Sequence, residues 1–253
     1  MSKQDLAMDV IGVHMRKNFR NRIIHYNYPA IVKLAYYDAI TYNPDTGKGG
    51  ATFGLRFNKY KYNKFTKPHA NIIEELIYIK QRKADPRFDS LSYSDYLQNF
   101  SIIGIKDAGG PNLAEFNLFG RADAKTEADL EGADEIPDPD KGATHFIDLF
   151  KKKGFSERDI VALSYIYAFG NVRTYYEKTY TNFHVFDNQF YKNIGDCSLS
   201  KILKGDAKLK EYVDLFAKEK KEFYEAFTEA YLKLYTLGNG DSKLYFELSK
   251  YDY

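Results

Sequence analysis

Residues 156–170 read SERDIVALSYIYAFG and predict a helix. Ser156, followed three residues later by Asp159, has the spacing of a capping box, in which each side chain satisfies a backbone N–H group at the start of a helix. The apolar run after Asp159 then continues the helix past Tyr167. The functional interpretation of the whole chain depends on this tyrosine.

Five more helices are predicted outward from this stretch. Residues 29–42 and 70–83 carry apolar stripes, and the second of these helices has basic residues in its last turn. Ser92 and Asp95 repeat a capping-box-like start for a helix over 93–105. Near the C-terminus, Asp206 opens one helix, and a second helix carries Phe223 and Leu234 before it ends at Gly238. The tail 243–251 alternates enough for a short strand or a docking segment.

The pattern breaks between Ile105 and Gly142. This long acidic segment has little apolar periodicity, so we expect a solvated surface loop. It lacks the ligand spacing of a calcium loop. A loop of this length in a helical chain suggests a connector, here 107–143, between one lobe at about 1–110 and another at about 144–253.

Composition limits the class of protein. The chain has 253 residues, 44% of them hydrophobic, which suffices for one full-sized globular domain. A net charge of +2 suggests neither nucleic acid nor an anionic membrane as partner, and we expect no transmembrane or targeting segment in the chain as given. With 23 Tyr, 19 Phe and no Trp, the core is expected to be built from Tyr and Phe.

Common catalytic signatures are absent. There is no P-loop, strand-linked GxGxxG, HExxH pair or GxSxG elbow. The five histidines are scattered without the spacing of a metal pair, and Cys197 is the only cysteine. We therefore expect no metal site, and the residues alone indicate only a mainly α, aromatic-rich domain.

Collinear stretches over nearly the whole chain resemble the class I haem peroxidases, the ascorbate and cytochrome c peroxidase group. The segment YPAIVKLAYYDAITY resembles the distal helix, KGGATFGLRF the turn after it, and LSYSDYLQNFSIIGI a later helix. GFSERDIVALSYIYAFG resembles the proximal helix, and KEYVDLFAKEKKEFYEAFTEAYLKLYTLG the last helix pair. The resemblance implies a single domain with a two-lobed, haem-peroxidase-like helical fold and minor β structure.

The same resemblance implies that the peroxidase chemistry is lost. The family's distal arginine, aromatic residue and histidine correspond here to Lys33, Tyr36 and Tyr37. A phenol with a pKa of about 10 is a poor proton acceptor near neutral pH, so Tyr37 cannot easily replace the histidine. The iron-binding histidine corresponds to Tyr167 and the proximal Trp to Tyr180.

The remaining family positions are partly retained. The aspartate that orients the iron-binding histidine corresponds loosely to Ser200, so both members of that pair are replaced. Asn71 and Arg173 match an asparagine and a substrate-binding arginine of the family, and a structural role is expected for both. Within the class, the YDAITY and GRADAKTEADLEG runs resemble the haem-less, ascorbate-peroxidase-like proteins of the thylakoid lumen, which associate with photosystem II.

Three functional hypotheses follow. The first is a catalytically inactive, haem-free pseudoenzyme, without a cofactor, that serves as an accessory subunit of a membrane-associated complex, a photosystem by resemblance or else a respiratory complex. The second is a haem enzyme with Tyr167 as a phenolate ligand, for which Arg173 would have to lower the phenol pKa. The third is a small-molecule binder in which Arg173 or Lys33 meets an anion in the vacated cleft.

The resemblance also suggests a compartment, the thylakoid lumen of a plastid, with the mitochondrion as the alternative. Aromatic side chains are enriched at the anchors of protein interfaces. We therefore propose six of them as candidate partner contacts: Tyr60, Tyr62, Tyr245, Phe246, Tyr251 and Tyr253.

Overall fold

The computed structural model describes residues 23–61, 63–81, 91–113, 118–170 and 184–239, and within these residues the fold is helical. The first half contains α2 (Ile23–Ala39), α3 (Asn58–Lys61), α4 (Ala70–Gln81) and α5 (Tyr93–Asp107). The second half contains α6 (Ala143–Lys152), α7 (Glu157–Ala168), α9 (Gln189–Lys192), α10 (Ser198–Gly205), α11 (Ala207–Lys218) and α12 (Lys220–Thr236). The prediction of a mainly α, peroxidase-like helical fold is confirmed.

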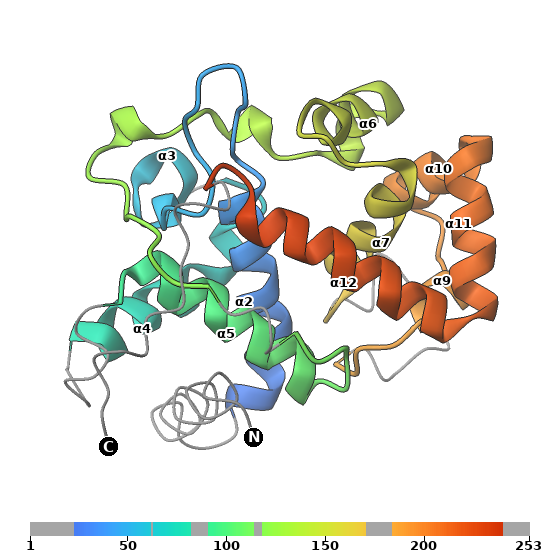
Figure 1. Ribbon diagram of the computed structural model, residues 1–253, viewed down its shortest axis with the longest axis horizontal. Helices are drawn as coiled ribbons and strands as arrows, with labels where there is room; N and C mark the ends of the chain where they lie inside the picture. The colour runs from blue at the N-terminus through green and yellow to red at the C-terminus, as the bar shows by residue number, and fades with distance from the viewer. Residues whose placement is uncertain (1–22, 62, 82–90, 114–117, 171–183, 240–253) are drawn as a thin grey trace.

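The helices form two groups that α12 connects (Figure 1). Helix α5 lies along α2, whereas α7 is packed by α11 and α12, and both α7 and α12 also contact α2. Helix α2 is therefore the element that the two groups share. The exact division into lobes stays a prediction.

The ends of the helices follow the predicted caps. At α7 the Ser156 side chain accepts from the Asp159 backbone N–H and the Asp159 side chain accepts from the Ser156 N–H, so the capping box is confirmed. Asp206 caps α11 as predicted, and Gly238, with φ +78°, follows the end of α12. Ser92 caps α5, but the Asp95 side chain does not complete a box there. It binds Arg121 instead.

The first predicted helix differs in its bounds. We predicted 29–42, but α2 begins at Ile23 and ends at Ala39, with Pro29 inside it. Downstream, the Asp38 carboxylate accepts hydrogen bonds from the backbone N–H groups of Phe53 and Gly54 at 2.8 and 2.9 Å. These bonds tie the end of α2 to the short helix η1 (Gly54–Arg56), and Phe53 adopts a left-handed φ of 52° there.

The expectation of a solvated connector holds for residues 125–129, which are exposed, but it is wrong for other described parts of the connector. Three short 3-10 helices, η5 (Glu127–Asp129), η6 (Ala133–Glu135) and η7 (Pro139–Lys141), order it. Its apolar side chains at Leu113, Ala124, Leu130 and Ile136 are buried in the core. Isolated apolar residues without periodicity can still be buried one at a time, which is why pattern reasoning missed them.

The buried Arg121 side chain fixes the connector to α5 and α12. The Arg121 guanidinium is fully buried and binds the Asp95 carboxylate of α5 at 2.9 Å. It also donates to the Tyr235 backbone carbonyl of α12 at 2.8 Å and lies over the Tyr235 ring at 4.0 Å. A guanidinium that is paired, hydrogen-bonded and stacked in this way meets the conditions under which a buried charge is tolerated.

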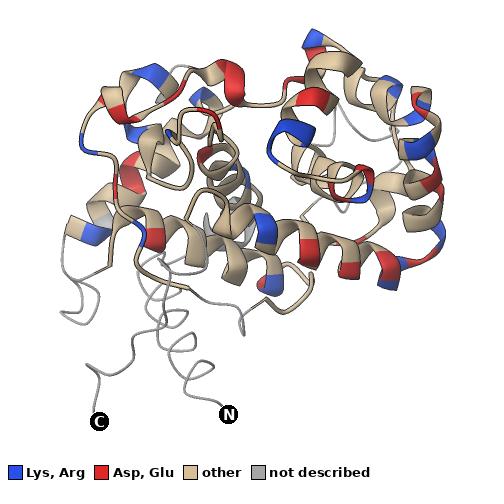
Figure 2. Ribbon diagram, turned by 45° about the horizontal axis from the view of Figure 1, so that its top comes forward, with Lys and Arg blue, Asp and Glu red and all other residues tan. Residues whose placement is uncertain are grey.

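Strand structure is nearly absent from the described residues. They contain an isolated antiparallel bridge between Asn43 and Lys48 and single bridge residues at Phe119 and Ile194, and the predicted strand at 243–251 lies outside them. The core is rich in Tyr and Phe as predicted, with Tyr165, Phe186, Phe223 and Phe227 in mutual ring contact. Acidic and basic residues are interspersed along α12 (Figure 2), in keeping with the small net charge.

Candidate functional site

Three predicted site residues meet where α2 and α7 cross. Tyr36 and Tyr37 come from α2 and Tyr167 from the last turn of α7, and all three side chains are buried. The ring centroids lie 5.5 Å apart for Tyr36 and Tyr167, 6.2 Å for Tyr37 and Tyr167, and 5.4 Å for Tyr36 and Tyr37. All three pairs are edge-on, the geometry that aromatic quadrupoles favour. We call these three residues the tyrosine cluster.

The hydroxyl groups of the cluster form a short chain. The Tyr167 hydroxyl donates to the Pro137 carbonyl of the connector at 2.5 Å. Because that proton is committed, the 2.9 Å contact between the Tyr36 and Tyr167 hydroxyls is a hydrogen bond donated by Tyr36. Burial raises the pKa of Tyr36 well above its ordinary value, and the bond to Tyr167 lowers it by less. Tyr36 is therefore a neutral phenol at physiological pH.

Two phenylalanines close the cluster. Phe65 lies against Tyr37 at 5.2 Å and against Tyr167 at 6.2 Å between centroids, and Phe146 of α6 lies 5.9 Å from Tyr167. No motif or spacing in the sequence selects Phe65, Phe146 or Pro137. They lie in three segments far apart along the chain, and only the crossing of α2 and α7 brings them together.

The other predicted positions do not join the cluster. Ser200 is buried in α10, where its hydroxyl hydrogen-bonds the Cys197 backbone N–H and carbonyl at 3.0 and 2.9 Å. Asn71 is exposed in the first turn of α4. Tyr180 and Arg173 lie outside the described residues. Ser200 thus has a capping role at α10.

Lys33 is one turn before the tyrosine cluster on α2 and is only 7% exposed. Burial lowers the pKa of its ammonium to about 8. Burial and the nearby Lys33 charge also lower the pKa of His69 to about 4. The family resemblance selects Lys33, whereas His69 is one of five scattered histidines, and no spacing along the chain links the two residues.

The predicted partner contacts are partly corrected. Tyr60 is wrong as a surface contact because it is 1% exposed and its hydroxyl donates to the Glu131 carbonyl. Tyr62 and the four tail aromatics lie outside the described residues.

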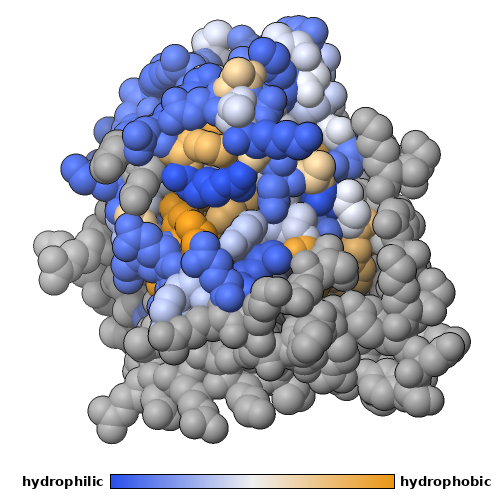
Figure 3. Space-filling model, turned by 90° about the vertical axis from the view of Figure 1, so that its left-hand side faces the viewer, coloured by the Kyte–Doolittle hydropathy of each residue, from blue (hydrophilic) through white to orange (hydrophobic). Residues whose placement is uncertain are grey.

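On the side of the molecule that Figure 3 shows, the described surface is mainly hydrophilic with small apolar patches. Tyr78 of α4, half exposed, is a large apolar side chain on the described surface.

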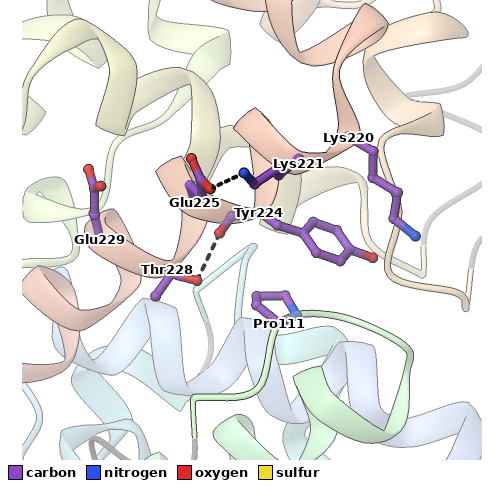
Figure 4. A pocket seen from close by; sticks show the side chains of 7 residues that line it. All are labelled: Pro111, Lys220, Lys221, Tyr224, Glu225, Thr228 and Glu229. Carbon is purple, nitrogen blue, oxygen red and sulfur yellow. Dashed lines mark hydrogen bonds and ion pairs between the residues drawn. The ribbon is translucent and has the colours of Figure 1, made fainter.

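A separate groove of about 670 Å³ lies beside the first half of α12 and Pro111 (Figure 4). Its charges are compensated locally, since Lys221 pairs with Glu225 at 3.5 Å. Thr228 hydrogen-bonds the Tyr224 backbone carbonyl at 2.8 Å, and the Tyr224 hydroxyl donates to the carbonyls of the neighbouring loops. The polar groups of this groove are therefore satisfied without a ligand.

The described residues contain neither a candidate metal site nor a membrane-spanning helix. No group of three or more His, Cys, Asp or Glu side chains in this part of the chain could hold a metal ion. None of the described helices is both long and apolar enough to cross a membrane.

Comparison with known proteins gives the family. A family model described as peroxidase matches residues 13–219. The chain is 32% identical over 230 residues to cytosolic L-ascorbate peroxidase 2 of Arabidopsis thaliana. The aligned region covers 85% of this chain and 86% of that protein. It is 28% identical over 248 residues to chloroplastic L-ascorbate peroxidase T of the same plant. That match covers 83% of this chain and 56% of the relative. Mitochondrial cytochrome c peroxidase of Cryptococcus neoformans is 26% identical over 239 residues. That match covers 83% of this chain and 61% of the relative. The chain belongs to the haem peroxidase family, in the class of ascorbate and cytochrome c peroxidases.

The residues of the tyrosine cluster do not fit a haem between them. The family resemblance would place the macrocycle between the residues at the distal positions, Tyr36 and Tyr37, and Tyr167 at the ligand position. In this structure the Tyr36 and Tyr167 hydroxyls are hydrogen-bonded to each other, and the rings touch. Two side chains in direct contact leave no layer for a flat ligand, and the Tyr167 hydroxyl is already engaged by the Pro137 carbonyl.

Proposed function

We propose that this chain is a haem-free pseudoenzyme of the peroxidase family that serves as an accessory subunit of a larger membrane-associated complex. The observation that carries the first part is the direct contact of Tyr36, Tyr37 and Tyr167 across the space where the family resemblance places the haem. Buried aromatic side chains supply the packing that a macrocycle would otherwise supply.

The chemistry of the same residues supports the absence of peroxidase activity. Peroxide cleavage in this family needs a distal base and a stabilising cation. Tyr37 at the base position is a phenol, and Lys33 at the cation position is a buried residue, 7% exposed. Tyr37 therefore offers no effective proton acceptor to a peroxide at the distal position.

The phenolate-ligand hypothesis receives less support from this geometry. An axial tyrosinate requires a deprotonated phenol with a nearby cation to stabilise it. The Tyr167 hydroxyl instead keeps its proton in a 2.5 Å bond to the Pro137 carbonyl and accepts a second bond from Tyr36. The bond to Pro137 forms only while Tyr167 keeps its proton, so it stabilises the neutral phenol.

The partner and compartment are proposed from resemblance. We propose a photosystem, with photosystem II as the assembly and a plastid thylakoid as the compartment, because of the likeness to haem-less thylakoid-lumen proteins. One relative named above is chloroplastic, which is compatible with a plastid, and another is mitochondrial, which keeps a respiratory complex as the alternative.

An absorption spectrum tests the haem-free state. Natively purified chain, measured in the Soret region with and without added haemin, should show no band beyond that of free haemin. Tyr167→Phe is the matched variant, since it removes only the hydroxyl. A stoichiometric Soret band in the wild-type chain that disappears in Tyr167→Phe would overturn the proposal in favour of a tyrosinate-ligated haem enzyme.

A native gel tests the accessory role separately. Membranes from the source cells, solubilised in mild detergent, should show the chain comigrating with a photosystem, identified by its pigment in the same lane. Comigration with a pigment-free respiratory complex would move the assignment to the mitochondrion. A chain that runs solely as a monomer in all extracts would contradict the subunit role, whatever the spectrum shows.

A further inference from the structure

An apolar groove on the exposed side of α12 has charged side chains at both ends. Glu229 lies at one end and Lys220 at the other, and the side chains of Tyr224 and Pro111 lie between them (Figure 4). The groove has a volume of about 670 Å³, which is within the range of binding pockets. A segment that fills it therefore needs an apolar centre, a basic residue toward Glu229 and an acidic residue toward Lys220.

The two terminal charges are available to a new partner. Lys220 is exposed, and its ammonium lies 4.7 Å from the centroid of the Tyr224 ring and makes no ion pair with a described residue. The Glu229 side chain is 65% exposed and pairs with the guanidinium of Arg158. An exposed pair of this kind contributes about 1 kcal/mol or less, so it does not prevent Glu229 from accepting a second cation.

The end of α12 carries signals for a reversal of the chain. The helix ends at Thr236, and Gly238 follows it with a left-handed φ of 78°. Asn239 and Gly240 then form a dipeptide that is typical of tight turns. Residues 240–253 lie outside the described residues. The conformation of Gly238 and the residue types after it thus favour a return along α12 for the segment that follows.

This following segment has the required order of charges. Residues 243–248 read KLYFEL. In an extended segment every second side chain lies on the same face, so Lys243, Tyr245 and Glu247 share one face. That face carries a cation, an aromatic ring and an anion in this order, which is the complement of the groove.

The distances along the chain match as well. Asn239, the last described residue, is about 15 Å from Glu229 along the direction of α12, and an extended chain from Asn239 to Lys243 spans about 13 Å. Lys220 is about 14 Å further along the helix, and an extended chain from Lys243 to Glu247 again spans about 13 Å. A segment that runs antiparallel to α12 therefore brings both of its charges level with the opposite charges of the groove.

We propose that residues 243–247 of this chain dock in the groove, antiparallel to α12. Two ion pairs and one aromatic contact would hold the segment: Lys243 with Glu229, Glu247 with Lys220, and Tyr245 with Tyr224 and Pro111. Because the ion pairs are exposed and individually weak, burial of the Tyr245 ring supplies most of the binding. Of the candidate partner contacts in the tail, Tyr245 is then committed to the groove and Phe246 faces away from it. The docking does not depend on the proposed pseudoenzyme function, since it uses no residue of the tyrosine cluster.

Zero-length cross-linking of the full chain tests the docking. A carbodiimide joins a carboxylate to an amine only where the two are in contact, so it should link Glu247 to Lys220 and Lys243 to Glu229. The links are mapped by mass spectrometry. Lys208 of α11 is the matched control, because it is also an exposed lysine but does not line the groove. The link from Glu247 to Lys220 should form at least tenfold more than the link from Glu247 to Lys208, and equal yields overturn the proposal.

A pair of tail variants separates a specific contact from a chance one. Tyr245→Ser removes the aromatic anchor but leaves both charges of the segment in place, so it should reduce the link from Glu247 to Lys220 several-fold. Tyr251→Ser changes a tyrosine outside the docked segment and should leave the yield as in wild type. The proposal fails if the two variants behave alike.

An isotope mixture identifies which chain supplies the segment. Equal amounts of ¹⁵N-labelled and unlabelled wild-type chain are cross-linked together. Each link from Glu247 to Lys220 should join two labelled or two unlabelled peptides. Mixed links at half of the total would overturn docking within one chain in favour of docking between two copies.

Discussion

Removing a single hydroxyl from the tyrosine cluster tests whether its bonds are ordered as the structure indicates. Tyr167→Phe removes the group that donates to the Pro137 carbonyl and accepts from Tyr36. Two buried polar groups, the Tyr36 hydroxyl and the Pro137 carbonyl, then lose their partner. Each such loss costs about 1–3 kcal/mol, and we expect the variant to lose about 2–4 kcal/mol of unfolding free energy.

Tyr36→Phe should cost less, although the change is chemically identical. It removes one hydrogen bond but leaves the Tyr167 hydroxyl still donating to the Pro137 carbonyl, so no buried donor is left unpaired. We expect a loss of about 0.5–1.5 kcal/mol. In the double variant the Tyr36 hydroxyl no longer exists to be left unpaired, so its loss should be smaller than the sum of the two single losses.

Urea unfolding followed by far-ultraviolet circular dichroism provides the assay, since the chain has no tryptophan for fluorescence. The slope of the unfolding free energy against urea should be unchanged, because none of the variants alters the surface exposed on unfolding. The reasoning is refuted if Tyr36→Phe costs as much as Tyr167→Phe, or if the two losses add.

Three further predictions concern the fold and its charges. Arg121→Met should cost about 3–5 kcal/mol of unfolding free energy in urea, because it leaves a buried carboxylate unpaired, and an equal stability of Arg121→Met and the exposed-site control Lys221→Met would contradict this. Gly170→Ala should destabilise the chain more than Gly154→Ala in the same assay. Both glycines have positive φ (73° and 81°), but a Cβ at Gly170 would lie 2.4 Å from a proline ring atom of α2, whereas a Cβ at Gly154 meets nothing within 4 Å; equal losses would refute the close packing of α7 on α2. Burial lowers the pKa of Lys33 from 10.5 to about 8. Between pH 8 and pH 10.5 the unfolded chain therefore binds more protons than the folded chain. Wild type should therefore gain about 3 kcal/mol relative to Lys33→Met as pH rises from 8 to 10.5, and parallel pH profiles of the two proteins would show that Lys33 is not buried as a charge.

Local signals in the sequence determined several elements of this protein. The capping box at Ser156 and Asp159, the cap at Asp206 and the glycine after α12 were predicted from residue type and spacing, because a cap depends on atoms only a few residues apart. The collinear likeness to the peroxidase class gave the family. It also selected Tyr36, Tyr37 and Tyr167 as the residues at the former reactive positions.

The tertiary structure alone decided how those residues meet. Side-chain identities do not reveal the distance between two helices, so the sequence could not say whether the three rings leave a gap or touch. It also could not place the Pro137 carbonyl against Tyr167, bury the connector residues Leu130 and Ile136, or bring His69 near Lys33. Each of these contacts joins segments that are far apart along the chain, and their free energy depends on distances and burial that exist only after the helices have packed.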